Sequence, residues 1–166
     1  MATTLDGPDR GDVPSFFHIN VNCTDFDRSL EFYRLLGFEV VNDFAGNAGF
    51  GEVGLGPVLN LPDDCDGRAV LMKLKGDRHG PRIDLIEWRS PKEAPLPPRT
   101  LAHPGVGRIC MRTTDADAVH DRLVAAGFRV YSPPTDITLG GSVIGVFCAE
   151  DPDGVVIEFM QFLGAA

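Results

Sequence analysis

The sequence predicts an α+β fold in which two tandem βαβββ modules form one shared cavity between curved sheets. Three observations predict it. A strand, a capped helix and a second strand follow one another over residues 16–41, and the same order returns over residues 107–131. Each half also ends in apolar strands, and the last strand of each has an acidic residue within an apolar run. Alternating apolar residues indicate strands, and apolar residues spaced by three and four indicate helices.

The first module opens with a strand. Residues 16–23 alternate between apolar and polar side chains, as a half-buried strand does. The pair Thr24-Asp25 offers an N-cap for a helix that runs to about Leu36. A short second strand is expected at residues 38–41.

The remainder of the first module is less regular. Residues 43–68 are rich in glycine, and we expect a loop with one short helix at residues 53–61. Two strands joined by a turn are predicted at 68–74 and 82–88. Residues 90–105 contain five prolines, which exclude a helix or a central strand and favour an extended linker.

The second module repeats this plan. Its predicted elements are a strand, a helix, a strand, a loop and two final strands, at residues 107–114, 115–126, 128–131, 132–141, 142–149 and 155–162. The expected organisation is one domain, made of a loose tail, a first module, a linker and a second module, at residues 1–14, 15–89, 90–105 and 106–163.

An internal duplication accounts for the two modules. Gly37-Phe38 and Gly127-Phe128 differ by 90 positions, and no gap is needed across the strand–helix–strand stretch. Near the module ends, Asp84 and Glu158 differ by 74 positions. The first module therefore holds 16 extra residues (90 − 74), which fall in the glycine-rich loop.

The duplication places four polar residues at equivalent positions: His18 with Arg108, and Asp84 with Glu158. Each interrupts an apolar strand. Burial without a partner costs such groups several kcal/mol, so we expect them to face a common cavity, the usual place for a small ligand.

Two segments carry a family resemblance. HINVNCTDFDRSLEFYRLLGF (18–38) and EDPDGVVIEF (150–159) are similar to signature segments of the vicinal oxygen chelate superfamily. That superfamily includes glyoxalase I, bleomycin- and fosfomycin-resistance proteins, methylmalonyl-CoA epimerase and extradiol dioxygenases. The resemblance covers residues 14–163 and implies a glyoxalase-like fold. It also implies a homodimer, and metal ligands on the first and last strand of each module, at His18, Asp84, Arg108 and Glu158.

Arg108 departs from the family pattern. A guanidinium stays protonated and has no free lone pair, so it cannot bind a metal. His18, Asp84 and Glu158 remain as a ligand set for a divalent metal of unknown identity, if one is bound. Since this set lacks the two histidines of an oxygen-activating iron site, a dioxygenase is the least favoured function. Arg108 is expected either to neutralise the carboxylates or to bind an anionic oxygen of the ligand.

Two functions follow. The first is an isomerase, epimerase or lyase that transfers a proton next to a carbonyl. Glu158 would be its base, Arg108 would stabilise the anion, and His18 and Asp84 would hold the metal. The second is a metal-free protein that binds or sequesters a ligand such as an antibiotic. Seven side chains are expected to line an apolar pocket or to belong to the core: Phe44, Phe50, Met72, Trp88, Met111, Phe147 and Met160.

Composition and charge disfavour two classes of partner. The net charge of −9 disfavours nucleic acid and anionic membranes, which attract basic patches. The four cysteines, Cys23, Cys65, Cys110 and Cys148, form no CxxC pair and are expected to be buried free thiols in a reducing cytoplasm. The polar N-terminus lacks the apolar core of a signal peptide.

Overall fold

Two four-stranded sheets and three helices make up the described part of the chain. The computed structural model describes residues 13, 15–44, 49–94 and 100–165. In chain order the elements are β1 (His18–Asn22), α1 (Phe26–Leu35), β2 (Phe38–Asp43), α2 (Leu55–Val58), β3 (Asp66–Leu74), β4 (Arg82–Ser90), β5 (Ile109–Arg112), α3 (Ala116–Ala125), β6 (Thr135–Leu139), β7 (Ser142–Glu150) and β8 (Val156–Ala165). The predicted α+β class is confirmed.

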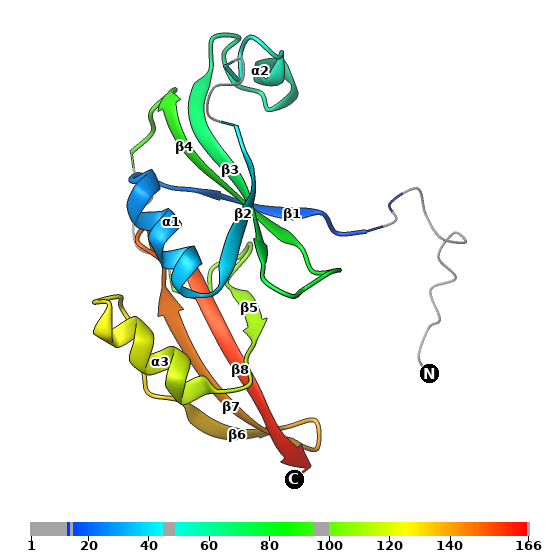
Figure 1. Cartoon of the computed structure of the whole chain (residues 1–166), viewed down its shortest axis with the longest axis vertical. Helices are drawn as coiled ribbons and strands as arrows, with labels where there is room; N and C mark the ends of the chain where they lie inside the picture. Colours follow the sequence, from blue (N-terminus) through cyan, green and yellow to red (C-terminus); the bar gives the residue numbers. More distant parts are fainter. Residues whose placement is uncertain (1–12, 14, 45–48, 95–99, 166) are drawn as a thin grey trace.

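The two sheets have the same topology. The first has the strand order β1-β4-β3-β2 and the second the order β5-β8-β7-β6. In each, the first strand is parallel to the last, and the other pairs are antiparallel. Figure 1 shows the first sheet above the second, with α1 and α3 on the same side of the molecule.

The two longer helices, α1 and α3, show the predicted offset of 90 positions. Both bounds of α3 lie 90 positions after those of α1 (26 + 90 = 116 and 35 + 90 = 125). Each helix begins after an aspartate whose side chain accepts a hydrogen bond from a backbone N–H. Asp25 accepts from Arg28 at 3.1 Å, and Asp115 accepts from Ala118 at 2.9 Å. The predicted helices and caps are confirmed.

One hydrophobic core joins both sheets. It contains the inner faces of α1 and α3 and one face of each sheet, including Leu85 and Ile157. Phe32 of α1 packs edge-on against Phe128 of the second half, with ring centroids 4.9 Å apart. We call the opposite face of each sheet the open face. Because side chains alternate along a strand, the residues next to those core positions, Asp84 and Glu158, lie on the open face.

The strand predicted at residues 128–131 is wrong. Only Val130 forms a bridge there, and β6 lies at Thr135–Leu139, inside the predicted loop 132–141. Pro133 and Pro134 explain the difference, because proline cannot donate to a sheet ladder. Tyr131 still donates its backbone N–H to Cys148, so this edge follows β7 and resumes after the prolines.

Two other predictions can be compared with the structure, and two fall largely on residues that it does not describe. The short helix in the glycine-rich loop is confirmed as α2. The strand predicted at 107–114 is shorter, so that Arg108 directly precedes β5. The N-terminal tail and the centre of the linker lie largely outside the described residues. None of the described helices has the length and apolar character needed to cross a membrane.

Candidate functional site

A histidine–aspartate pair lies on the open face of the first sheet. Nε2 of His18 is 3.9 Å from Oδ2 of Asp84, and the side chains are 40% and 18% exposed. His18 begins β1, and Asp84 lies on the neighbouring parallel strand β4. The parallel pairing of the first and last strands of the module brings together two residues that are 66 positions apart (84 − 18).

Asn20 completes this pair. It lies opposite Asp84 in the β1–β4 register, and its Nδ2 is 3.4 Å from both the backbone oxygen and Oδ2 of Asp84. Burial raises the pKa of the Asp84 carboxyl, whereas the Asn20 hydrogen bond and the nearby His18 oppose the shift. The aspartate is therefore held by two side chains of its own chain.

An arginine–glutamate ion pair occupies the equivalent place on the second sheet. Nε of Arg108 lies 2.9 Å from Oε1 of Glu158, and the side chains are 45% and 15% exposed. The hydrogen bond and the charge of Glu158 raise the pKa of Arg108. The Arg108 guanidinium therefore lies beside the Glu158 carboxylate, and nearly half of the arginine side chain is exposed to solvent.

Two thiols flank Glu158 on the open face. Cys110 is its register partner on β5, and Cys148 is its partner on β7. Burial and a hydrogen bond to Glu158 raise the pKa of the Cys110 thiol to about 11. Burial, followed by the charge of Glu158, also raises the pKa of Cys148. Both thiols are therefore neutral near pH 7.

The two pairs are copies of one arrangement. His18 and Arg108 differ by 90 positions, as do Asn20 and Cys110. Asp84 contacts His18 and Asn20, and Glu158 contacts Arg108 and Cys110. The predicted four residues thus form two pairs of equal register, one on each sheet.

The predicted metal ligands are divided between these pairs. Among the described residues, no three His, Cys, Asp or Glu side chains lie close enough together to hold a metal ion. His18 and Asp84 belong to the first sheet, and Glu158 is bound to Arg108 on the second. Within one chain, these residues do not fit the three-ligand centre, and a metal at this place stays a prediction.

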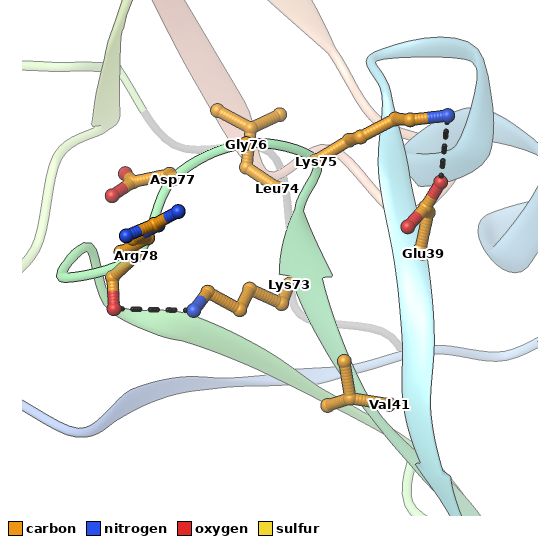
Figure 2. A pocket seen from close by; sticks show the side chains of 8 residues that line it. All are labelled: Glu39, Val41, Lys73, Leu74, Lys75, Gly76, Asp77 and Arg78. Carbon is orange, nitrogen blue, oxygen red and sulfur yellow. Dashed lines mark hydrogen bonds and ion pairs between the residues drawn. The ribbon is translucent and has the colours of Figure 1, made fainter.

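A separate pocket of about 190 Å³ lies beside the turn between β3 and β4. Figure 2 shows its polar contacts. Lys75 pairs with Glu39 at 3.3 Å, and Nζ of Lys73 donates to the backbone oxygen of Arg78 at 3.1 Å. None of the four predicted site residues lines this pocket. Its charges are of both signs, so it gives no ligand class.

Sequence reasoning missed several residues of the open faces. Asn20 is not among the four predicted site residues, although its spacing of two from His18 places both on one face. Cys110 was expected to be buried and is exposed, because β5 lies at the edge of its sheet. Cys148 is only partly buried, whereas Cys23 and Cys65 are buried as predicted.

The seven aromatic and methionine side chains that were candidates for an apolar pocket lie partly in the core and partly outside it. Met72 and Phe147 belong to the core, and Met111 packs against it. Phe50 and Trp88 instead contact each other near the end of the first sheet. Phe44 and Met160 are partly buried and also lie outside this core, so four of the seven remain candidates for a pocket.

Comparison with known families gives one match. Residues 15–159 match the family model described as the Glyoxalase/Bleomycin resistance protein/Dioxygenase superfamily. Among curated proteins, no sequence is similar enough to count as a relative.

Solved structures share the fold at low sequence identity. A glyoxalase family protein from Bacillus cereus superimposes with a TM-score of 0.77 at 15% identity, over 95% of this chain and 100% of that one. An antibiotic binding protein from Streptomyces sp. gives 0.57 at 21% identity, over 92% and 98%. A glyoxalase I mutant from Zea mays gives 0.59 at 13% identity, over 89% of this chain and 45% of that one.

Proposed function

Because the chain belongs to the glyoxalase/bleomycin resistance protein/dioxygenase superfamily, we propose that it binds a small organic molecule on the open faces of its sheets without requiring a divalent metal. The binding site includes the His18–Asp84 pair and the Arg108–Glu158 pair. The four free cysteines agree with a reducing cytoplasm as the place where it acts.

The observation that carries this proposal is the ion pair between Arg108 and Glu158, at 2.9 Å. A metal centre needs carboxylate lone pairs that are free to bind the ion, and here one oxygen of Glu158 accepts from a guanidinium. On the other sheet Oδ2 of Asp84 accepts from Asn20. Both acids have partners within the protein, so neither needs a metal ion to compensate for its partial burial.

Arg108 is the group that would contact an anionic or carbonyl oxygen of the ligand. Its side chain is 45% exposed, and its Nε lies 2.9 Å from Oε1 of Glu158. The remaining guanidinium N–H groups are arranged as a fork that suits carboxylates. A ligand oxygen can bind them while the ion pair to Glu158 stays in place.

We also propose a homodimer. The strands that carry or adjoin the two pairs, β1 and β5, each stand at the end of a sheet, where one edge pairs with no other described strand. Large apolar side chains are exposed beside these edges, with Phe16, Phe17 and Val106 being 66%, 54% and 90% exposed. A second copy would cover these edges and would bring the pair of one chain toward the pair of the other. Size-exclusion chromatography coupled to light scattering should give twice the mass of the monomer.

Proton transfer next to a carbonyl is the second candidate function. It is favoured by the position of Glu158, whose side chain is only 15% exposed beside a fixed cation. If a ligand oxygen replaced Glu158 on Arg108, the freed carboxylate would be a base next to a stabilised anion. Glu158→Gln should then abolish deuterium exchange at the acidic carbon of a bound α-hydroxycarbonyl compound, while the affinity for that compound stays within about threefold.

Native mass spectrometry of the purified protein, combined with elemental analysis, tests the leading proposal. We expect a small organic molecule to be retained by protein that carries no stoichiometric divalent metal. Arg108→Gln should lose this molecule, and Arg112→Gln, a matched change at the last residue of β5, should keep it. Retention only in a metal-loaded fraction would contradict the proposal.

A further inference from the structure

An aromatic corner of Phe50 and Trp88 stands on the open face of the first sheet. Their ring centroids are 5.3 Å apart, and the rings meet edge to face. The indole N–H of Trp88 donates to Oδ1 of Asn22 at 2.9 Å. Both aromatic residues are partly exposed. The hydrogen bond to Asn22 fixes the plane of the indole ring, and Phe50 supports it.

The extra residues of the first module build this corner. The backbone N–H of Gly51 donates to Cys65 at 2.8 Å and so closes the loop that carries Phe50. A Cβ on Gly67 would come within 2.9 Å of the Phe50 ring. The ring therefore occupies the space above β3 that a side chain at position 67 would fill. Gly67 is paired with Trp88 in the β3–β4 register. The loop thereby holds a phenyl ring directly beside the indole.

The corner and the His18–Asp84 pair share one face. Asp84, Ile86 and Trp88 alternate along β4, so all three project to the open side. Trp88 lies four positions after Asp84, or about 13 Å along the strand. Between them lie Ile86 and its register partner Ala69, which are only 7% and 2% exposed although neither belongs to the main core.

We propose that the ligand carries a planar aromatic ring, which packs against Trp88 and Phe50 on the same open face as His18 and Asn20. The inference rests on the proposed binding function and adds a ligand class to it. Edge-to-face and offset stacking favour a flat π-system over a saturated ring of the same size.

Two matched compounds test the ligand class. 2-Naphthoate is flat and aromatic, and decahydro-2-naphthoate has the same carbon skeleton and carboxylate but no π-system. Trp88 is the only tryptophan of the chain, so quenching of its emission reports on the corner without a label. We expect 2-naphthoate to quench Trp88 and to bind at least about fivefold more tightly than the saturated acid.

Calorimetric titrations of three variants show which side chains contact the aromatic ring of the ligand. Trp88→Leu and Phe50→Leu should each weaken 2-naphthoate binding by about five- to tenfold and leave the saturated acid nearly unchanged. Phe162→Leu, at an exposed phenylalanine of the second sheet, should affect neither compound. Circular dichroism of each variant shows whether the fold is intact.

The outcomes separate this inference from the proposed function. Equal binding of both acids, lost in Arg108→Gln but not in Trp88→Leu, would overturn the aromatic class and leave the proposed binding site standing. Binding of 2-naphthoate that depends on Trp88 and Phe50 but not on Arg108 would support the aromatic class and count against Arg108 as the anion contact. No binding of 2-naphthoate at millimolar concentration would overturn the inference.

Discussion

Tyr33 and Asp151 join the two halves of the molecule by a buried hydrogen bond. The phenol oxygen of Tyr33, on α1, donates to Oδ2 of Asp151 at 3.0 Å. The aspartate also accepts the backbone N–H groups of Asp153 and Val155, at 2.9 and 2.8 Å. The turn it stabilises leads into β8, which carries Glu158. The segment that resembles a family signature is thus also the link between the sheets.

Removal of this hydroxyl should destabilise the protein. Tyr33 is fully buried and Asp151 is 4% exposed, so Tyr33→Phe leaves a buried carboxyl with one donor fewer. We expect the free energy of unfolding in urea to fall by about 1.5–3 kcal/mol. Tyr131→Phe is the control. Its hydroxyl donates to Glu150 at 2.6 Å, but Tyr131 is 44% exposed, and the cost should stay below about 1 kcal/mol. Equal costs would contradict this account.

Asp151 should make stability depend on pH. Burial raises the pKa of its carboxyl, although the backbone N–H groups and Tyr33 oppose the shift. A carboxyl with a raised folded pKa binds its proton more tightly in the folded state. The contribution of the Asp151 carboxyl to the free energy of unfolding is therefore fully present at pH values below its ordinary pKa of about 3.9. This contribution is lost as the pH rises through the pKa of the folded state.

Asp151→Asn isolates this contribution, since the amide has a similar size and does not titrate. The wild-type protein should lose stability relative to Asp151→Asn as the pH rises from acid to neutral. Urea titrations at several pH values measure the difference. A difference that is constant, or that changes in the opposite direction, would show that the carboxyl has no raised pKa.

The exposed thiol of Cys110 should react slowly. With a pKa of about 11 in place of the ordinary 9.0, the thiolate fraction near pH 7 is about 100-fold lower than that of a free cysteine. Iodoacetamide labelling, followed by peptide mass spectrometry, should be correspondingly slow and should rise with pH. Glu158→Gln removes one cause of the shift and should speed labelling several-fold. An unchanged rate in this variant would rule out the contact between Cys110 and Glu158.

Gly67→Ala should disturb the aromatic corner. A Cβ there would lie 2.7 Å from the backbone oxygen of Glu87 and 2.9 Å from the Phe50 ring. We expect a loss of about 1–3 kcal/mol in stability and a red shift of Trp88 emission. Gly145→Ala is the control on β7, where the nearest atom is 3.4 Å away. If both variants were equally stable, Gly67 would not be needed for the packing of Phe50.

Local patterns predicted the helices and the repeat. The aspartate caps and the 90-residue offset place α1 and α3 correctly, because capping and apolar spacing act within a few residues. The same offset predicted that His18 and Arg108 are equivalent. The break before β6 was harder to predict, because Pro133 and Pro134 interrupt an edge whose partner, β7, comes later in the chain.

The contacts of the open faces depend on pairing between distant strands. That Glu158 has Cys110 on one side and Cys148 on the other follows from the strand order, which composition does not determine. Phe50 and Trp88 are 38 positions apart (88 − 50) and meet only because a loop without sequence periodicity folds over Gly67. The sequence indicated which residues were candidates, and the sheet register determined their partners.

Calorimetric titration of 2-naphthoate into chelator-treated protein tests the central claim most directly. We expect the dissociation constant to stay within about twofold of the untreated value, and we expect Arg108→Gln to weaken binding by about ten- to hundredfold while Arg112→Gln does not. Binding that is lost on treatment with the chelator and restored by a divalent metal would contradict it.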